Sequence, residues 1–327
     1  MNSSVAMRSE PPRHRPRKRF GQHFLSDVWA QKVVQAINPQ PGDVFLEIGP
    51  GAGAITLPLA ATGAPILAVE IDRDLVAALA ARVPPNVTLL TGDFLRTEVM
   101  NFLAGLSPVR PPVGVASSIS TARGAPPPLA RPAALEDSLS SAGLSMPRGA
   151  SPPTTKRVRV VGNVPYNLSS AILFRLIELY RRDGVFADAT VMLQREVADR
   201  LVAKPGTKAY GVLSISAQIH TTMTRLLELP PGAFRPAPKV HSAVARIVFH
   251  PPAVRLVDEP LFDRMIRTMF SARRKTLSNA LKPFDQTAPA VLALCGIDGR
   301  RRPETLQLAE LARLAELFAS AKRPLML

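Results

Sequence analysis

The sequence predicts an α/β fold in which helices cover both faces of a parallel β-sheet, followed by a small domain built of helices alone. Short apolar segments alternate with amphipathic segments from residue 28 onward, and after an interruption the alternation resumes at residue 158. From residue 261 only helical patterns occur. Strands that alternate with helices at this spacing are typical of a parallel sheet with helices on both faces.

The individual elements follow from short apolar runs and from the turns that bound them. Residues 28–37 have helical periodicity and end before a turn at residues 39–42. Strands are expected over 44–48, 66–71, 87–90, 158–161, 190–193 and 244–249. Helices are expected from the glycine-rich loop to residue 61, over 75–82, from a cap at Ser169 or Ser170 to Tyr180, and over 195–202. Residues 212–219 fit either a strand or a helix, because their periodicity does not decide.

The C-terminal part carries an apolar stripe at helical spacing. Its members recur at i, i+3, i+4, i+7 and i+8, and they are Phe262, Met265, Ile266, Met269 and Phe270. A further helix is expected from about residue 303, with apolar side chains at Leu308, Leu311, Leu314 and Phe318. We therefore expect a basic tail over residues 1–19, an α/β domain over 20–252 and a helical domain over 253–327.

Residues 104–155 interrupt the alternation. These 52 positions contain 10 prolines, 9 serines and no aromatic residue. A segment of this composition buries too little apolar area to offset the entropy lost on ordering, so we expect a disordered insert between two elements of the sheet.

The charge of the chain points to a polyanionic partner. There are 41 Lys and Arg against 25 Asp and Glu, which gives a net charge of +16. No uninterrupted apolar run reaches the length of a membrane span, so nucleic acid is favoured over a membrane. Residues 1–19 lack the apolar core of a secretion signal, so we expect a cytoplasmic protein. They contain six Arg or Lys, which fits either a disordered basic tail or an arm that contacts phosphates. The single cysteine, Cys295, excludes a disulfide framework and a multi-cysteine zinc site, and no metal is expected.

A glycine-rich loop between the first strand and its helix predicts a nucleoside-binding site. Gly49 and Gly51 lie in the segment EIGPGAG and allow a ligand to approach the backbone closely. Glu70 ends the second strand, where an acid accepts hydrogen bonds from ribose hydroxyls. Asp93 ends the third strand, where a carboxylate accepts from an adenine amino group. By themselves these features also suit NAD, and a glycine turn beside solvated acids is the simpler alternative.

The tetrapeptide Asn163-Val164-Pro165-Tyr166 after the fourth strand decides between these possibilities. The Asn163 side-chain carbonyl and the Pro165 backbone carbonyl are two acceptors suited to the two N–H bonds of an adenine N6 amine. Accepting from both bonds favours a more pyramidal and more nucleophilic nitrogen. Tyr166 offers a ring on which the base stacks. Positioning against an electrophilic methyl sulfonium then supplies most of the rate enhancement, so no strong general base is required.

The chain resembles the small-subunit rRNA adenine dimethyltransferases of the KsgA (RsmA) type, within a wider group that includes the Erm enzymes. The resemblance covers nearly all of the chain outside residues 104–155 and the extreme N-terminus. Its segments are RKRFGQHFLSD (17–27), FLEIGPGAG (45–53), AVEIDRDL (68–75), GDFL (92–95), VVGNVPYNLSS (160–170), MLQREVADRL (192–201), KAYGVLS (208–214), FRPAPKVHSAV (234–244) and FSARRKTLSNAL (270–281).

The resemblance implies a Rossmann-like class I methyltransferase domain that uses S-adenosylmethionine, with a C-terminal helical domain. It implies N6 dimethylation of two adjacent adenosines in the 3′-terminal hairpin of 16S rRNA during ribosome biogenesis, by a monomer acting on rRNA or a pre-30S particle. The implied cofactor-binding residues are His23, Leu25, Gly49, Gly51, Glu70, Asp93 and Asn163. The family often has Asn at position 23 and Leu at position 164. Neither difference removes a polar group that the chemistry needs.

Two further segments are expected to contact the RNA. In the segment FRPAPK, Phe234 is expected to close the second face of a flipped adenine, and a core phenylalanine beside a rigid turn is the simpler alternative. Pro236 holds the loop extended, and Lys239 adds a positive charge to it. Arg273, Arg274 and Lys275 follow an amphipathic helix and are suited to phosphates. Residues 300–302, Arg-Arg-Arg, are a weaker signal of the same kind.

Three alternative functions compete with this prediction. An Erm-type enzyme would modify 23S rRNA, but the segments after residue 233 resemble the small-subunit group more closely. A non-catalytic nucleic-acid-binding factor on the same fold is disfavoured by the intact tetrapeptide. An NAD-dependent oxidoreductase lacks an acid/base pair for hydride transfer.

Overall fold

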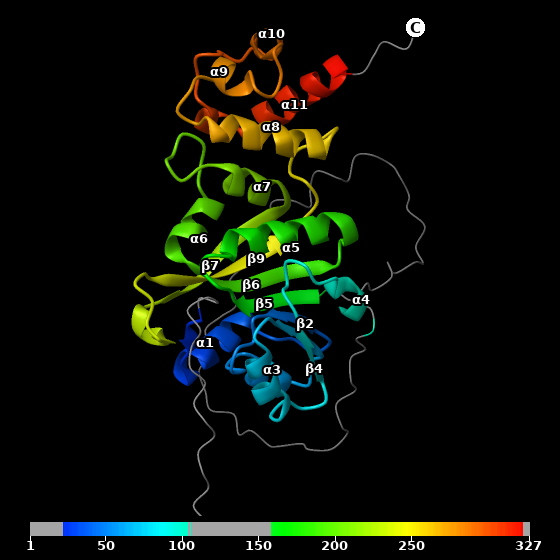
Figure 1. Cartoon of the computed structure of the whole chain (residues 1–327), viewed down its shortest axis with the longest axis vertical. Helices are drawn as coiled ribbons and strands as arrows, with labels where there is room; N and C mark the ends of the chain where they lie inside the picture. Colours follow the sequence, from blue (N-terminus) through cyan, green and yellow to red (C-terminus); the bar gives the residue numbers. More distant parts are fainter. Residues whose placement is uncertain (1–21, 104, 106–157, 323–327) are drawn as a thin grey trace, which may run out of the picture. The chain divides into compact units, whose positions relative to one another are not determined.

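The computed structural model describes residues 22–103, 105 and 158–322 (Figure 1), so the predicted tail at 1–19 and nearly all of the predicted insert at 104–155 lie outside the described residues. The described residues form a seven-stranded sheet in the order β4-β3-β2-β5-β6-β9-β7. Its strands are β2 (Val44–Ile48), β3 (Ile66–Glu70), β4 (Val87–Thr91), β5 (Val158–Asn163), β6 (Phe186–Gln194), β7 (Thr221–Leu229) and β9 (Ser242–Phe249). Strands β4, β3, β2, β5 and β6 are parallel, and β9 runs antiparallel to β6 and β7.

Helices precede, connect and cover the strands. They are α1 (Asp27–Ile37), α2 (Thr56–Ala60), α3 (Arg73–Ala80), α4 (Val99–Leu103), α5 (Ser169–Asp183), α6 (Arg195–Leu201) and α7 (Val212–His220). A second sheet pairs β1 (Phe24–Leu25) antiparallel with β8 (Phe234–Arg235), which follows the 3₁₀ turn η2 (Pro231–Ala233). This small sheet joins the segment before α1 to the FRPAPK segment, 210 residues later in the chain.

Two apolar layers hold the large sheet. Because successive strand residues point to opposite faces, Leu46 and Ile48 of β2 pack in one layer and Phe45 in the other. The first layer includes Leu173 and Leu176 of α5, and the second includes side chains of α1 and α2. Every residue of β2 and of β3 is buried, as expected for central strands of a sheet covered on both faces.

The C-terminal helices share one apolar cluster with α7. These elements are α8 (Glu259–Ser271), α9 (Leu277–Leu281), α10 (Ala288–Leu294), the 3₁₀ turn η3 (Pro303–Thr305) and α11 (Leu308–Lys322). Figure 1 shows α7 between the sheet and α8. Ile215 and Ile219 of α7 join the cluster, and Arg181 of α5 pairs with Glu259 and Asp263 of α8. Among the described residues, no helix is both long enough and apolar enough to cross a membrane.

Most expected elements occur within a few residues of their expected positions. The ambiguous segment 212–219 is the helix α7, whereas β1, α4, β7, β8, α9 and α10 were not expected. The expected serine cap of α5 is wrong, because Leu168 occupies the cap position without a side-chain bond. The Ser169 hydroxyl instead donates to the Pro165 carbonyl oxygen.

Candidate active site

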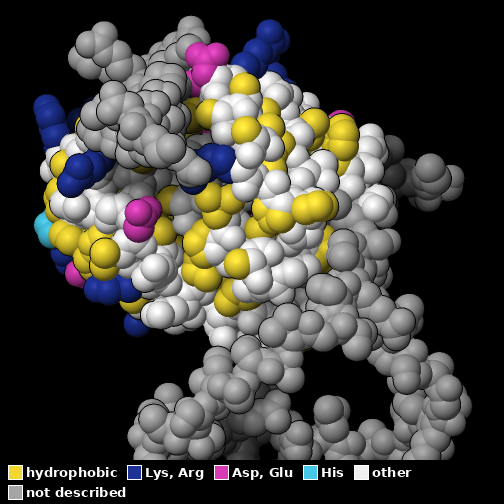
Figure 2. All heavy atoms as spheres, turned by 90° about the horizontal axis from the view of Figure 1, so that it is seen from below, with side chains coloured by type: hydrophobic (Ala, Val, Ile, Leu, Met, Phe, Trp, Pro, Cys, Tyr) yellow, Lys and Arg dark blue, Asp and Glu magenta, His cyan; other side chains and the backbone are white. Residues whose placement is uncertain are grey.

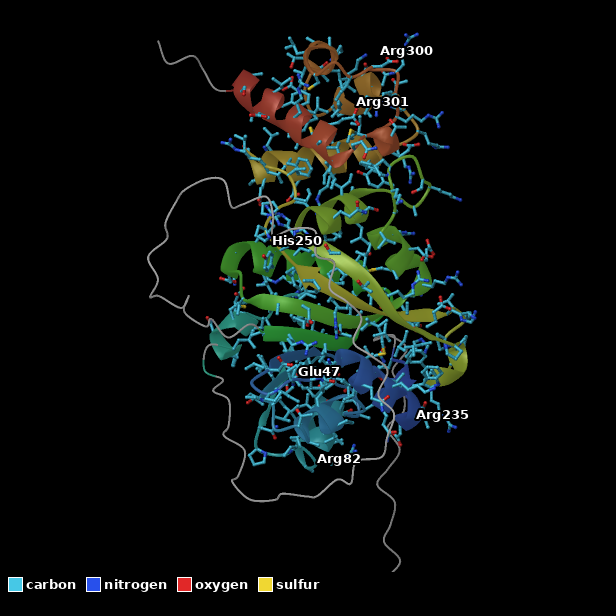
Figure 3. All side chains as sticks on the ribbon, turned by 180° about the vertical axis from the view of Figure 1, so that it is seen from behind. Glu47, Arg82, Arg235, His250, Arg300 and Arg301 are labelled. Carbon is cyan, nitrogen blue, oxygen red and sulfur yellow. The ribbon has the colours of Figure 1, made fainter. Side chains whose placement is uncertain are left out.

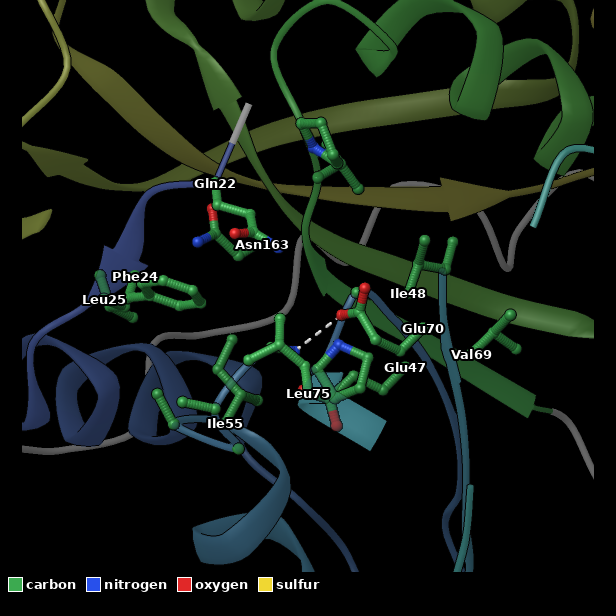
Figure 4. Close-up of a pocket in the computed structure, with 18 of the residues that line it drawn as sticks. Gln22, Phe24, Leu25, Glu47, Ile48, Ile55, Val69, Glu70, Leu75 and Asn163 are labelled. Atoms are coloured by element: carbon green, nitrogen blue, oxygen red, sulfur yellow. Dashed lines mark hydrogen bonds between the residues drawn. The ribbon is translucent and has the colours of Figure 1, made fainter. Parts of the chain in front are cut away.

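A cavity of about 530 Å³ lies at the carboxyl ends of the first parallel strands (Figure 4). Ligands of open α/β sheets characteristically bind at this edge. Nine of the residues predicted from the sequence line the cavity, and they are His23, Leu25, Gly49, Gly51, Glu70, Asp93, Asn163, Pro165 and Tyr166. The structure therefore brings together the whole predicted cofactor set and the whole predicted catalytic set.

The glycine-rich loop depends on backbone conformations that favour glycine. Gly49 has φ +69° and Gly51 has φ +57°, both in the left-handed region. The Phe24 ring covers Gly51 so closely that a Cβ atom there would lie 3.3 Å from the ring. The Gly51 N–H donates to Glu70 Oε2 at 3.0 Å, which ties the loop to the end of β3 (Figure 4).

The strands next to this loop carry two buried carboxyl groups, Glu47 of β2 and Glu70 of β3. Glu70 accepts from the Asp72 N–H through Oε1, and burial raises its pKa. Glu47, at the end of β2, is 1% exposed, and its Oε2 has no hydrogen-bond partner among the described residues. Burial raises the pKa of Glu47 to about 7, and the charge of Glu70 adds to this effect. The neighbouring Thr56 hydroxyl opposes the shift, although its oxygen makes no well-aligned hydrogen bond.

Asp93 closes the far side of the cavity. Its Oδ1 accepts from the Leu95 N–H at 3.0 Å, and the Arg96 guanidinium lies 3.9 Å from Oδ2. The neighbouring wall carries Ile71, an apolar side chain that is 44% exposed and lines the cavity. An acceptor beside an exposed apolar wall is an arrangement suited to a purine with an exocyclic amine.

Asn163 has a fixed side-chain orientation. Its Nδ2 donates to the His23 carbonyl oxygen at 2.7 Å, so the amide Oδ1 is left to accept from a ligand. The preceding Gly162 is pressed against β2, because a Cβ atom there would lie 2.6 Å from the Ile48 carbonyl oxygen. The close pairing of β5 with β2 thus sets the position of Asn163 at the edge of the cavity.

Pro165 and Tyr166 form a tight turn that leads into α5. The Pro165 carbonyl oxygen accepts from the Leu168 N–H at 2.9 Å and from the Ser169 hydroxyl at 3.2 Å, so it is already engaged within the turn. The Tyr166 ring stacks on the His23 ring with centroids 5.4 Å apart. Its hydroxyl lies 2.5 Å from Ser242 Oγ, and burial raises the pKa of the phenol.

The FRPAPK segment lies beside the cavity but does not line it. Phe234 is 2% exposed and packs in the core, where β8 pairs it with Leu25. It is therefore not placed to stack on a ligand in this conformation. The Pro236 carbonyl oxygen lies 2.7 Å from His23 Nδ1 and accepts from it when that nitrogen is protonated, and Lys239 is exposed.

The three residues of the basic cluster after α8 differ in their contacts. Arg273 donates to the carbonyl oxygens of Lys208 and Thr207, at 2.7 and 3.0 Å, so its guanidinium holds the loop before α7. Arg274 and Lys275 are exposed. Figure 3 places Arg300 and Arg301 in the C-terminal helical part of the molecule, where Arg301 is paired with Glu310. Lys and Arg side chains also appear at several places on the face shown in Figure 2, as the positive net charge requires.

Several residues of the site were not singled out from the sequence. Gln22 and Phe24 line the cavity, and Ser242 contacts Tyr166. Ser242 stands within the segment FRPAPKVHSAV, but nothing in its local pattern indicates a partner 76 positions away. Within the described residues there is no cluster of three or more His, Cys, Asp or Glu side chains arranged to hold a metal ion.

Comparisons with known proteins agree with this arrangement. The chain matches the family model "Ribosomal RNA adenine dimethylase" over residues 13–320. It is 39% identical over 316 residues to "Ribosomal RNA small subunit methyltransferase A" of Aromatoleum aromaticum, which covers 95% of this chain and 97% of that protein. The protein of the same name from Xylella fastidiosa (strain Temecula1 / ATCC 700964) is 37% identical over 301 residues, 91% of this chain and 94% of that one.

Two solved structures share the fold at low sequence identity. A dimethyladenosine transferase from Plasmodium falciparum aligns with a TM-score of 0.59 at 18% identity and covers 91% of this chain and 98% of its own. The 23S rRNA methyltransferase ErmE aligns with a TM-score of 0.52 at 20% identity and covers 90% and 99%.

Proposed function

The chain belongs to the ribosomal RNA adenine dimethylase family, and from this premise we propose that it methylates N6 of two adjacent adenosines in the 3′-terminal hairpin of small-subunit rRNA. It is an rRNA adenine dimethyltransferase, as the sequence predicted. The predicted Rossmann-like methyltransferase fold with C-terminal helices is also confirmed. The fixed amide of Asn163 at the edge of the cavity is the observation that carries the mechanism.

The residues of the cavity fit S-adenosylmethionine. This cofactor supplies an electrophilic methyl group, and each transfer forms an N–C bond to N6, breaks the S–C bond and releases one proton. Glu70 lines the cavity and would accept from the ribose hydroxyls, while Asp93 and the exposed Ile71 suit the adenine. We place the methionine part against the glycine-rich loop, because Gly49 and Gly51 both line the cavity.

The N-terminal strand completes the cofactor site in this proposal. His23 offers its backbone and ring, Leu25 offers an apolar wall, and both line the cavity. The His23 carbonyl oxygen also orients Asn163, so the same segment serves the cofactor and the reacting amine. The backbone pairing of β1 with β8 supports this proposal, because it fixes the position of the segment next to the cavity.

Asn163 Oδ1 accepts one N–H of the target amine. As the methyl group transfers, positive charge develops on N6, so this interaction is stronger in the transition state than in the ground state. The second acceptor is the Pro165 carbonyl oxygen. It becomes available to the amine when the Ser169 hydroxyl releases it, because that hydrogen bond is longer than the one from the Leu168 N–H. No step of this scheme requires a base with a tuned pKa, because the amine is made reactive by its two acceptors.

Tyr166 stacks on the flipped adenine. Base–aromatic stacking contributes about 1–3 kcal/mol per base. We assign the second face of the base to Phe234, as the sequence predicted, only after a movement of β8 that exposes its ring. In the conformation described here that ring is buried. The exposed Pro236, Lys239, Arg274 and Lys275 remain candidates for contact with the RNA.

The proposed partner is small-subunit rRNA or a pre-30S particle, and we propose that the enzyme acts as a cytoplasmic monomer. The names of the bacterial relatives support small-subunit rRNA as the substrate. The likeness to ErmE concerns the fold alone and does not favour 23S rRNA. The intact Asn163–Tyr166 segment opposes a non-catalytic role. Residues 20–252 would form the methyltransferase domain and 253–327 the helical domain.

The test replaces Asn163 by Ala and compares single-turnover methylation of unmethylated 30S subunits at saturating cofactor. Loss of one preorganised polar partner costs about 10²–10³ in rate. RNA affinity should change little, because phosphate contacts dominate it. Asn167→Ala is the matched control, since Asn167 follows in the same turn but is exposed and does not line the cavity. A near-normal rate for Asn163→Ala would refute the assigned role.

Primer extension identifies the methylated bases independently of that rate. Dimethylated adenine blocks Watson–Crick pairing, so reverse transcriptase stops at it. Wild-type enzyme should produce a stop in the 3′-terminal hairpin of 16S rRNA and none in 23S rRNA. A stop that appears only in 23S rRNA would favour the Erm-type alternative.

A further inference from the structure

Tyr166 is held at the tip of its ring by a residue with no assigned role. The Tyr166 hydroxyl and Ser242 Oγ are 2.5 Å apart. Ser242 is 1% exposed and begins β9, between Gln194 of β6 on one side and Leu229 of β7 on the other. A side chain at this position has the rigidity of the sheet, whereas Tyr166 lies in a turn.

The ring of Tyr166 has a second restraint on its face. His23 stacks on it, and the His23 ring nitrogen Nδ1 lies 2.7 Å from the Pro236 carbonyl oxygen. His23 just before β1 and Ser242 at the start of β9 thus both contact the ring of Tyr166 in the catalytic turn. A contact of the hydroxyl alone would fix the tip and leave rotation about the long axis of the ring. A contact with the face alone would allow the Tyr166 ring to slide along the His23 ring. The two contacts together therefore fix the plane of the Tyr166 ring.

We propose that Ser242 is a positioning residue for adenine methylation, because its hydroxyl holds the plane of Tyr166 on which the target base stacks. This inference rests on the proposed function of Tyr166. Ser242 touches neither the cofactor site nor the reacting nitrogen and acts through Tyr166 alone. It is absent from the residues that line the cavity.

The second methyl transfer depends on this restraint more than the first. An adenine N6 amine has two N–H bonds, one for Asn163 Oδ1 and one for the Pro165 carbonyl oxygen. After one transfer a single N–H bond remains, so hydrogen bonds orient the base less and stacking on Tyr166 orients it more. Loosening the ring therefore slows the second transfer more than the first, and monomethylated adenine accumulates.

The experiment compares Ser242→Ala with Tyr166→Phe, which remove the same hydrogen bond from opposite sides. A hydrogen bond of this kind contributes enough for a roughly 2- to 12-fold effect. We expect each variant to raise KM for 30S subunits and the ratio of monomethyl- to dimethyladenine within that range. Cofactor affinity should not change. The double variant should match the single variants, because the bond can be lost only once.

Ser214→Ala is the matched control for loss of a buried hydroxyl. Ser214 is fully buried, and its Oγ donates to the Arg200 carbonyl oxygen at 2.6 Å, away from the cavity. This variant should keep the product ratio of the wild type. If Ser242→Ala does not fold, Tyr166→Phe tests the same bond without altering the sheet. A wild-type product ratio in Tyr166→Phe overturns the proposal.

A spectroscopic measurement separates this proposal from the proposed function. The chain has three tyrosines, Tyr166, Tyr180 and Tyr210, so 3-fluorotyrosine labelling gives three ¹⁹F signals. Tyr166→Phe assigns the first. In Ser242→Ala that signal should shift and broaden while the other two stay in place. If the signal does not change, Ser242 does not hold Tyr166. If it changes but the product ratio does not, Tyr166 does not orient the base, and its proposed role is the part that fails.

Discussion

Replacing Glu47 by Gln should stabilise the protein at neutral and alkaline pH. The Glu47 side chain is 1% exposed, and its Oε2 has no hydrogen-bond partner among the described residues. Ionising a carboxyl in such a place is costly, first because of burial and then because the Glu70 charge is near. Glutamine has nearly the same shape and carries no charge at any pH, so the change with pH of the stability difference between the two proteins isolates the titration of Glu47.

The magnitude follows from the pKa of about 7 in the folded protein, against 4.5 for an ordinary glutamate. A folded-state pKa that is raised in this way means that the stabilising contribution is fully present below pH 4.5 and is lost as the pH rises to about 7. The difference between these two pKa values corresponds to roughly 3 kcal/mol of stability. Between pH 5 and pH 8 the wild type should lose about 2–3 kcal/mol relative to Glu47→Gln.

Urea unfolding of both proteins at pH 5, 6, 7 and 8 measures this difference directly. Glu316→Gln, which changes an exposed carboxyl of α11, shows what the substitution itself contributes to the pH dependence. The difference between wild type and Glu47→Gln should grow with pH and level off above pH 7. A constant difference across this range would show that Glu47 is not buried as an uncompensated acid.

Two further predictions concern residues at the edges of the site. Gly162→Ala should destabilise the protein by about 1–3 kcal/mol in urea unfolding. The added Cβ would lie 2.6 Å from the Ile48 carbonyl oxygen, so it must push β5 away from β2. Unchanged stability would mean that the two strands separate without cost. Changing Arg274 and Lys275 together to Ala should reduce the slope of log K for RNA binding against log salt concentration by about 1.5. Arg273→Ala should instead lower the free energy of unfolding by about 1–2 kcal/mol and leave that slope unchanged. The reverse pattern would mean that Arg273 faces the RNA.

The central strands were predictable because each is covered on both faces. Strands β2 and β3 are short, wholly apolar or nearly so, and bounded by turns, so a reading of the sequence places them within a residue or two. The residues that line the cavity follow directly from these strands, since Glu70, Asp93 and Asn163 stand at or just beyond the ends of strands that lie in one parallel sheet. Parallel topology thus converts positions in the sequence into neighbours in space.

The edge of the sheet was less predictable. Strand β7 is half exposed, and the register with β9 shifts between Arg225 and Leu227, which breaks the alternation of polar and apolar residues. Helices α9 and α10 contain only five and seven residues, too few for a clear period, and packing in the C-terminal apolar cluster stabilises them. In these segments tertiary contacts decide the local structure.

The contacts that tune the site were the least predictable. Phe234 is an apolar residue beside two prolines, and the sequence favoured a stacking ring although the same pattern also fits a core residue. Pairing of β8 with β1 buries it, and that pairing joins segments 210 positions apart. The Ser242–Tyr166 contact likewise depends on the register of β9 in the sheet. Residue type indicates what a side chain is able to do, but long-range register decides which neighbour it meets.

Arg273 shows why charge patterns overstate nucleic-acid contacts. In the sequence it is indistinguishable from Arg274 and Lys275, and all three fit a phosphate-binding cluster. In the structure its guanidinium satisfies two carbonyl oxygens of the loop before α7. If this guanidinium turned to a phosphate, it would give up both hydrogen bonds to the backbone, each of which contributes about 0.5–1.5 kcal/mol. Exposed cations carry no such cost, so the phosphate contacts of this cluster should fall to Arg274 and Lys275.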